Sequence, residues 1–334
     1  MIGLSVLDQL QELVATLNSY RASAAGSSPS FCVGIETERP KWVLAGALEA
    51  IRAQGWDACC VWDSEIDARV RKMPGTKLVS PFLHGFSYGA VMNRLLLLAA
   101  ASDCDYLLRI DPGTECASGL GEMAGMHLAA RERGMEATSG QYTNRLGLRD
   151  DFVRPVERAR YYALVREATG MDCRPGRQLT AGAGMFMSSQ GPPAIPFEDV
   201  GVWASDDGFQ QLFRGGGKTE VLDEIKVGRA NPGILLDCNR YLARVAAAVV
   251  LRGAHEGRTR ESALADARGF LYEVEKFLAS GINYAPDEAV RAISSQVDAV
   301  YCGYDNYLRL IEEWPAISDR FAGSVDRKKL LAWG

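Results

Sequence analysis

Apolar residues follow two patterns along this chain: a spacing of three or four positions, and short continuous runs. In residues 3–22 they recur every three or four positions, which is the spacing of one face of an amphipathic helix. The members of this face are Leu4, Leu7, Leu10, Leu13, Val14 and Leu17. Residues 24–30 are small and polar and predict a linker. Short apolar runs at 31–35 and 58–62 predict buried strands, and the stretch 41–54 predicts the helix that joins them.

This strand–helix–strand order predicts a parallel sheet, because a crossover helix returns the chain to run in the same direction. An apolar stretch at 89–101 predicts a helix that leads into a strand ending at Asp111. The other segments predict helices at 119–134 and 205–214, strands at 70–72, 137–143, 179–188 and 219–222, and late helices at 239–252, 259–280, 285–300 and 303–314. We therefore expect an N-terminal helix and linker (1–30), an α/β domain (31–238) and a helical C-terminal region (239–334).

The composition is that of a soluble globular protein, with 47% hydrophobic and 24% charged residues among 334. The net charge of -5 argues against nucleic acid as the main partner, because phosphate backbones need a clustered basic face. The eight cysteines include no Cys-x-x-Cys pair, which argues against a zinc site, and several lie inside apolar runs, where a thiol behaves as a small buried hydrophobe. Both observations favour a reduced, cytoplasmic protein. The N-terminal residues do not have the pattern of a secretory signal, and no apolar stretch is long enough to cross a membrane.

Two acids each follow an apolar run that reads as a buried strand. Asp111 ends the run from Tyr106 and is followed by Pro-Gly, and Asp63 follows the run at 58–62. Open α/β sheets bind ligands at the carboxyl ends of their strands, so both carboxylates are candidate ligand contacts. For Asp63 a helix N-cap is an equal alternative.

Arg94 lies in the apolar helix predicted at 89–101, where a buried cation needs a partner such as a diphosphate or the Asp111 carboxylate. The alternative is an exposed arginine beside Asn93 on the outer face of the helix. Arg109 and Asp105 are weaker candidates, because alternate positions of one strand can simply pair with their neighbours.

Asp206 and Asp207 stand together at the start of a predicted helix. A carboxylate at such a position can act as a general base that takes the proton of a bound hydroxyl. The alternative is ordinary acidic charge at a helix N-terminus. Trp203 can stack on the ring of a ligand, or lie in the core.

The order of these features resembles the GT-A fold of nucleotide-sugar glycosyltransferases, especially their large inverting family. The matching stretches are 31–35, 61–64, 89–111, 181–187, 196–198 and 205–214. The resemblance implies a Rossmann-like, mostly parallel sheet flanked by helices, here with a helical C-terminal extension. It also implies transfer of a sugar from a nucleotide-diphosphate donor to an acceptor hydroxyl, with inversion.

The resemblance implies roles for individual residues. The nucleotide-binding set is Glu36, Thr37, Arg39, Asp63, Asn93, Arg94 and Asp111. Asp207 is the implied catalytic base, with Asp206 beside it. The implied diphosphate or acceptor contacts are Trp203, Lys226 and Arg229.

The chain departs from the family at its metal site. The second acid of the Asp-x-Asp motif is replaced by Gly113, and the usual downstream histidine is absent. Glu115 can complete a magnesium or manganese site with Asp111, because an ion bridged by a diphosphate needs only one or two oxygens from the protein. Otherwise the site is free of metal, and cations such as Lys226 or Arg229 neutralise the leaving diphosphate.

Two other functions remain open. A sugar-phosphate nucleotidyltransferase would have a glycine-rich loop after its first strand, and residues 36–40 contain no glycine. A degenerate nucleotide-binding module is consistent with the loss of the second acid. The expected partners are a nucleotide sugar and an unidentified acceptor, and the late helices either bind that acceptor or form a homodimer.

Overall fold

A computed structural model of the protein describes ten stretches of the chain. They are residues 1–5, 10–22, 32–37, 41–73, 88–116, 118–142, 152–170, 183–189, 218–229 and 238–326. Eight strands form one sheet in the order β3-β2-β1-β4-β7-β6-β8-β5. Their bounds are β1 (Ile2–Ser5), β2 (Cys32–Thr37), β3 (Asp57–Trp62), β4 (Tyr106–Ile110), β5 (Thr114–Cys116), β6 (Ala137–Tyr142), β7 (Ala183–Ser188) and β8 (Thr219–Arg229).

The sheet has a parallel half and a mixed half. Strands β3, β2, β1 and β4 are all parallel to their neighbours. Strand β7 runs antiparallel to both β4 and β6, so β6 points the same way as β4. Strand β8 is parallel to β6, and the short β5 is antiparallel to β8. Four of the seven neighbouring pairs are therefore parallel, which confirms the expected mostly parallel α/β sheet.

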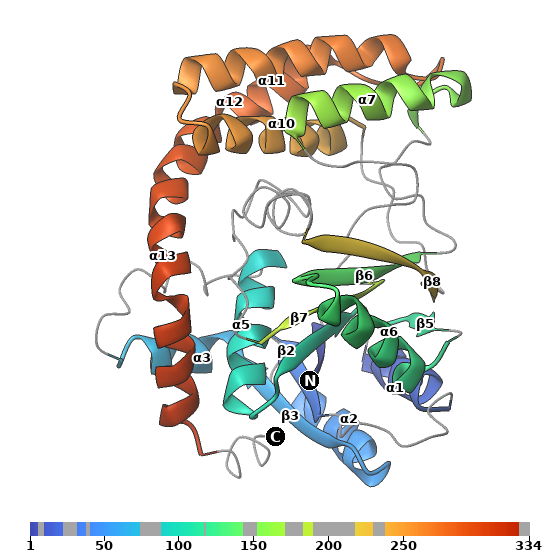
Figure 1. Cartoon of the computed structure of the whole chain (residues 1–334), viewed down its shortest axis with the longest axis vertical. Helices are drawn as coiled ribbons and strands as arrows, with labels where there is room; N and C mark the ends of the chain where they lie inside the picture. The colour runs from blue at the N-terminus through green and yellow to red at the C-terminus, as the bar shows by residue number, and fades with distance from the viewer. Residues whose placement is uncertain are drawn as a thin grey trace.

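Helices cover both faces of the sheet (Figure 1). Helices α1 (Leu10–Ala22), α2 (Lys41–Ala53) and α6 (Leu120–Glu132) share a core with one face, to which β1 contributes Ile2 and Leu4. Helix α5 (Tyr88–Ala101) covers the other face, where Leu107 and Met185 point. Helix α3 (Asp63–Val70) follows β3 directly.

Two glycines of the sheet let α5 approach closely. A Cβ on Gly3 would lie 2.7 Å from Leu107 Cδ1 and 3.2 Å from Leu95 Cδ1, and a Cβ on Gly34 would lie 3.0 Å from Leu98 Cδ2. Leu95 and Leu98 of α5 fill part of this space, together with Leu107 of β4 and the side chain of Met1, whose Sδ would lie 2.5 Å from a Cβ on Gly34. Because α13 packs on the opposite side of α5, this helix is buried on all sides and is apolar apart from a few residues, which include Asn93 and Arg94.

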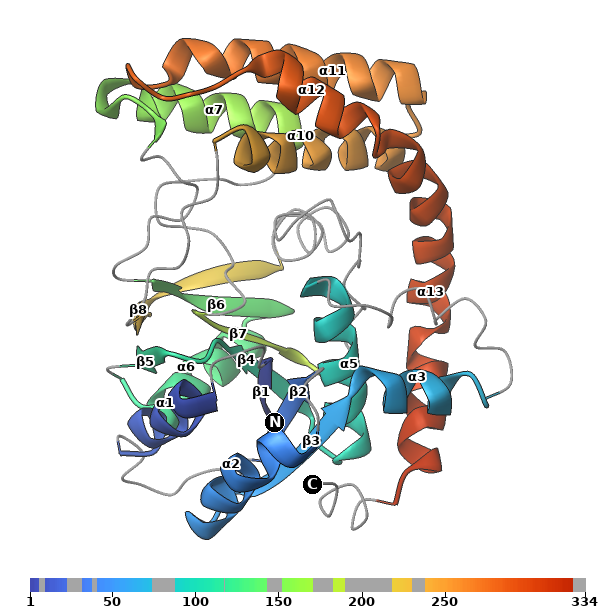
Figure 2. The ribbon, with the colours of Figure 1, turned by 180° about the vertical axis from the view of Figure 1, so that it is seen from behind.

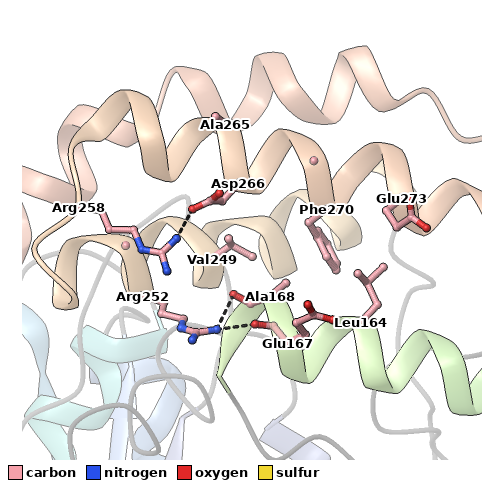
Figure 3. A pocket seen from close by; sticks show the side chains of 12 residues that line it. Leu164, Glu167, Ala168, Val249, Arg252, Arg258, Ala265, Asp266, Phe270 and Glu273 are labelled. Atoms are coloured by element: carbon pink, nitrogen blue, oxygen red, sulfur yellow. Dashed lines mark hydrogen bonds and ion pairs between the residues drawn. The ribbon is translucent and has the colours of Figure 1, made fainter.

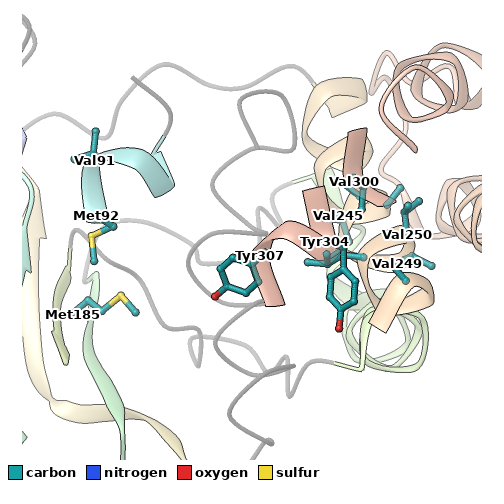
Figure 4. Packing of buried hydrophobic residues seen from close by; sticks show 14 of the residues in the cluster. Val91, Met92, Met185, Val245, Val249, Val250, Val300, Tyr304 and Tyr307 are labelled. Atoms are coloured by element: carbon teal, nitrogen blue, oxygen red, sulfur yellow. The ribbon is translucent and has the colours of Figure 1, made fainter. Parts of the chain in front are cut away.

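The C-terminal helices form a second layer together with α7, which comes earlier in the chain, and the long helix α13 connects this layer to the sheet (Figures 1 and 2). The layer consists of α7 (Arg158–Thr169), α10 (Cys238–His255), α11 (Arg260–Val274) and α12 (Pro286–Ser294), with short 3-10 helices η2 (Pro155–Glu157) and η4 (Glu275–Phe277). Helix α13 (Val297–Ser324) runs from this layer down along α5. Figure 4 shows Val300 and Tyr304 of α13 beside Val245 and Val249 of α10. The expected C-terminal helices are thereby confirmed.

The helix predicted over residues 3–22 is wrong at its start. Residues 2–5 form β1 in the middle of the sheet, between β2 and β4, and the helix begins only at Leu10. Leu4 was counted as part of the apolar helix face, but four residues are too few to separate a helical period from a strand period. The sheet therefore starts at Ile2, within the stretch expected to be helix and linker. The division of the chain into domains at residues 30 and 238 stays a prediction.

Three other elements differ from expectation. Residues 70–72 are not a strand, because α3 continues to Val70 and a turn follows. Strand β8 extends to Arg229, well beyond the predicted end at 222. The helices predicted at 285–300 and 303–314 are redistributed, because α13 runs without a break from Val297 through Pro315.

Candidate active site

The candidate residues of the parallel half lie along one edge of the sheet. Parallel strands present their carboxyl ends at the same edge, and β3, β2, β1 and β4 are consecutive and parallel. Glu36 and Thr37 are the last residues of β2, Asp63 directly follows β3, and Asp111 directly follows β4. Thr37 is paired with Trp62 in the register of β2 and β3. Four backbone positions predicted to contact the nucleotide are thus brought to one rim, which we call the carboxyl rim.

The Asp111 carboxylate is held by an arginine of its own strand. Arg109 Nη2 lies 3.0 Å from Asp111 Oδ1, and the guanidinium of Arg109 also donates to the carbonyl of Ile110. The Arg109 side chain is 3% exposed, whereas that of Asp111 is 19% exposed. Asp111 is therefore anchored from inside the protein while its carboxylate remains accessible.

Gly113 has a structural reason to replace an acid. Its φ is +78°, in the left-handed region that disfavours residues with a Cβ. A Cβ at this position would lie 2.7 Å from Oε2 of Glu12 on α1. An aspartate here would be strained and would also face a like charge. The turn after Asp111 is built for glycine, so a second acid two residues on does not fit it.

Strand β8 brings Arg229 to the same turn. The backbone of Arg229 is paired with that of Thr114, three residues after Asp111, and Glu115 is opposite Gly228. Lys226 is exposed and lies opposite Gln141 of β6. The chain thus places the backbone of one predicted cation, distant in sequence, beside the Asp111 turn.

Asn93 and Arg94 of α5 are both fully buried. The alternative of an exposed arginine on an outer helix face is therefore wrong. Their predicted roles in nucleotide binding stay predictions.

Arg39, Trp203, Asp206 and Asp207 lie outside the described residues. The ends of the segment that carries the last three are nevertheless fixed. Ser189 N donates to Asp105 O (2.9 Å), and Glu136 N donates to Lys218 O (2.6 Å), so both ends lie at the edge where β4 begins. Crossing the five residues of β4 takes about 17 Å, a span far shorter than residues 190–206 can reach when extended. This segment is therefore long enough to bring Asp207 to the carboxyl rim.

Among the described residues, no group of three or more His, Cys, Asp or Glu side chains is placed to hold a metal ion. Asp111 offers a partly exposed carboxylate, and Glu115 is exposed on β5 between two buried neighbours, Thr114 and Cys116. A divalent ion bridged by a diphosphate needs only one or two protein oxygens, so Asp111 fits a single ligand position. The metal role of Asp111 and Glu115 stays a proposal.

A pocket of about 450 Å³ lies in the helical layer, between α7, α10 and α11 (Figure 3). Its two arginines already have partners: Arg252 pairs with Glu256 and with the carbonyls of Glu167 and Ala168, and Arg258 pairs with Asp266. None of the predicted site residues lines it. The carboxyl rim is therefore the better candidate for the active site.

Within the described part of the chain, no helix has the length and apolar character needed to cross a membrane.

Comparisons with known proteins give distant structural likenesses only. No protein-family model matches the chain, and no curated protein does. Among solved structures, the chain is similar to mannosyl-3-phosphoglycerate synthase from Rubrobacter xylanophilus, with 15% identity, 77% of this chain and 74% of that one covered, and a TM-score of 0.47. It is also similar to glucosyl-3-phosphoglycerate synthase from Mycobacterium tuberculosis in complex with Mn2+, UDP and glucosyl-3-phosphoglycerate, with 14% identity, 77% and 80% covered, and a TM-score of 0.48.

A third likeness covers more of the chain. It is to residues 1–349 of S. aureus TarS in complex with UDP-GlcNAc, with 11% identity, 97% of this chain and 92% of that one covered, and a TM-score of 0.45. At such identities and TM-scores these likenesses assign neither a family nor an activity to the chain. What can be said of its chemistry comes from the arrangement of its own strands and side chains.

Proposed function

We propose that this protein is a glycosyltransferase that moves a sugar from a nucleotide-diphosphate donor to an acceptor hydroxyl, with inversion. One observation carries the proposal: the carboxyl ends of β2, β3 and β4 bring Glu36, Thr37, Asp63 and Asp111 to a single rim. Ligands of open α/β sheets bind at this edge. The GT-A resemblance of the sequence gives these positions a consistent set of roles.

In the proposed arrangement, the nucleoside lies against the turn after β2, with Glu36, Thr37 and Arg39, and against Asp63. A carboxylate at a strand end can accept hydrogen bonds from a base or a ribose hydroxyl. Asp111 faces the diphosphate or the ribose.

The leaving diphosphate carries negative charge that must be stabilised as the sugar departs. Arg94 and Asn93 of α5, and Lys226 and Arg229 of β8, are the proposed contacts. The pairing of Arg229 with Thr114 supports this, because it brings one cationic residue next to the Asp111 turn. A magnesium or manganese ion on Asp111 and Glu115 would share the same task.

Asp207 is the proposed base, assisted by Asp206, with Trp203 against the acceptor. Inversion requires one carboxylate to accept the acceptor's proton as the sugar is attacked from its far side. A cytoplasmic location and a homodimer through the C-terminal helices stay predictions.

A thermal-shift panel of nucleoside diphosphates, with and without manganese, tests the donor site. Ligand binding raises apparent stability by mass action, by about 2.7 kcal/mol at a hundredfold excess over Kd. We expect one nucleobase to raise the Tm most, and Asp111→Asn to abolish the shift. Asp105→Asn is the matched control, because Asp105 is an exposed acid at the opposite end of the same strand. A panel in which no diphosphate raises the Tm would reject the donor site.

Asp207→Asn tests the transfer step. Removing a general base costs about a hundredfold or more in turnover, while donor affinity should stay close to that of the unmodified protein. Unchanged turnover would remove Asp207 from the mechanism. Release of pyrophosphate from a nucleoside triphosphate and a sugar phosphate would indicate nucleotidyl transfer instead, and binding without turnover would indicate a degenerate module.

A further inference from the structure

Helix α1 packs against the turn that follows Asp111. Its residues share a core with β4 and β5 and include Leu13 and Leu17, which are fully buried. Two polar residues four positions apart, Thr16 and Tyr20, lie on the same buried side, at 2% and 0% exposure. Buried polar side chains need hydrogen-bond partners, and both of these find theirs in the Asp111 turn.

Two hydrogen-bonded connections join α1 to the turn. The amide of Gly113 donates to Thr16 Oγ1 at 2.8 Å. The hydroxyl of Thr114 donates to the carbonyl of Asp111 at 2.6 Å, and it lies 3.3 Å from the hydroxyl of Tyr20.

The direction of the Tyr20 contact follows from the proton count. A threonine hydroxyl has one proton, and that of Thr114 is used on Asp111, so Tyr20 donates to Thr114. Burial raises the pKa of Tyr20 well above its ordinary value, so the phenol keeps this proton. The result is a directed chain from Tyr20 through Thr114 to the backbone of Asp111.

We propose that Thr16 and Tyr20 are positioning residues, which hold the Asp111 turn so that its carboxylate faces the ligand. This inference rests on the proposed function, because it assigns the turn to the donor site. The carboxylate is held by Arg109 on the inner side, and the backbone is held by α1 on the other. The hydrogen bond of Thr16 to the Gly113 amide (2.8 Å) is shorter than that of Tyr20 to Thr114 (3.3 Å). We therefore expect the loss of the Thr16 contact to weaken binding of the nucleoside diphosphate more.

Thr16→Val removes the hydroxyl while keeping the shape of the side chain, and leaves the partly buried Gly113 amide without this acceptor. Thr16→Ser restores the hydroxyl, and Tyr20→Phe removes only the donor to Thr114. The matched control is Asn18→Ala, at an exposed position of the same helix. Hydrogen exchange of the 111–116 backbone and the affinity for the nucleoside diphosphate selected in the panel are measured for each variant.

We expect Thr16→Val to bind the nucleoside diphosphate about tenfold more weakly and Tyr20→Phe about threefold more weakly, the range set by the loss of one hydrogen bond. Thr16→Ser should bind within about twofold of the unmodified protein, on the same scale. Exchange at Gly113 should accelerate in Thr16→Val and stay slow in β4. A merely structural role would lower the Tm of Thr16→Val without changing the affinity of the folded protein.

The inference is overturned if the unmodified protein binds a nucleoside diphosphate and both variants bind it equally well. If Thr16→Val does not fold, Tyr20→Phe decides in the same way. Failure of the proposed function has a different signature, since the unmodified protein would then bind no diphosphate at all. In that case, exchange at Gly113 would still show whether Thr16 holds the turn.

Discussion

Single residues explain why the Asp111 turn departs from its expected sequence. Asp111 itself could be predicted, because an apolar run that stops at an acid before Pro-Gly is a local pattern. Thr16 and Tyr20 could not be assigned a role, since their partners are some ninety positions away along the chain. The one available signal was that both are polar on an otherwise apolar helix face. Gly113 looked like a loss and is instead a requirement of the backbone.

Gly113→Ala should destabilise the protein. A residue with a Cβ held at positive φ costs about 1–2 kcal/mol, and the Glu12 side chain must also move aside. Gly125→Ala is the control, because Gly125 lies in the middle of α6, is exposed to solvent, and has nothing within 4 Å of the position that a Cβ would take. That substitution should raise the unfolding free energy by up to about 1 kcal/mol through helix propensity. Urea unfolding of both variants measures the contrast, and equal effects would contradict it.

His127 should make the stability depend on pH. Burial lowers the pKa of His127 to about 3 from its ordinary value of 6.5, so the folded protein keeps the imidazole neutral, bonded to Thr138 Oγ1 and stacked on Phe186. Between these two pH values the unfolded chain binds a proton that the folded chain does not. The stability that the neutral imidazole of His127 gives the fold is therefore complete above pH 6.5. As the pH falls below that value, the unfolding free energy decreases by up to about 1.4 kcal/mol per pH unit.

His127→Asn removes this titrating group. We expect the unfolding free energy of the variant to fall less steeply than that of the unmodified protein between pH 7 and pH 5. Urea unfolding at several pH values gives the comparison. Parallel curves for the two proteins would rule out His127 as the source.

At the scale of elements, segments with a clear apolar pattern between polar or glycine breaks were predictable, and β1 was not. Helices α2 and α5 and strands β3 and β4 follow from their apolar patterns. The strand β1 has only four residues, and its neighbours β2 and β4 decide its conformation rather than its own sequence. The extension of β8 to Arg229 could not be predicted for the same reason. Its polar end is held in the sheet by pairing with β5 and β6, and its own sequence does not indicate a strand.

Helix α13 provides an element-scale test. Trp314 is 1% exposed on the side that packs into the core, whereas Leu308 on the same helix is 38% exposed. Trp314→Ala should lower the unfolding free energy by about 3–5 kcal/mol, the usual cost of truncating a buried aromatic side chain. Leu308→Ala should change it by no more than about 0.5 kcal/mol. Similar losses in both variants would mean that α13 is not packed as described.

At the scale of the whole molecule, the sheet and the C-terminal helices share one core. That core includes Leu95 of α5, Met185 of β7, Val249 of α10 and Trp314 of α13. The sequence could not reveal this, because periodicity shows that a helix is amphipathic but not which surface it meets. It also could not give the strand order, since the first strand was missed.

The shared core predicts a single unfolding transition for the whole chain. Calorimetry should give a van't Hoff enthalpy equal to the calorimetric enthalpy, as for one cooperative unit. Two separate transitions, one for the α/β part and one for the helices after residue 238, would contradict this and support independent domains.

The reversed direction of β7 has a consequence for how such a protein can diversify. Ser189 and Lys218, the described residues on either side of 190–217, both lie at the edge of the sheet where β4 begins, beside Asp105 and Glu136. A connecting segment whose two ends lie at one edge of a sheet can change in length or composition without shifting any strand. Under the proposed function, a change of acceptor would therefore need no change in the strands that carry Glu36, Asp63 and Asp111. Exchanging residues 190–217 for a segment of unrelated sequence should then leave the affinity for the nucleoside diphosphate unchanged.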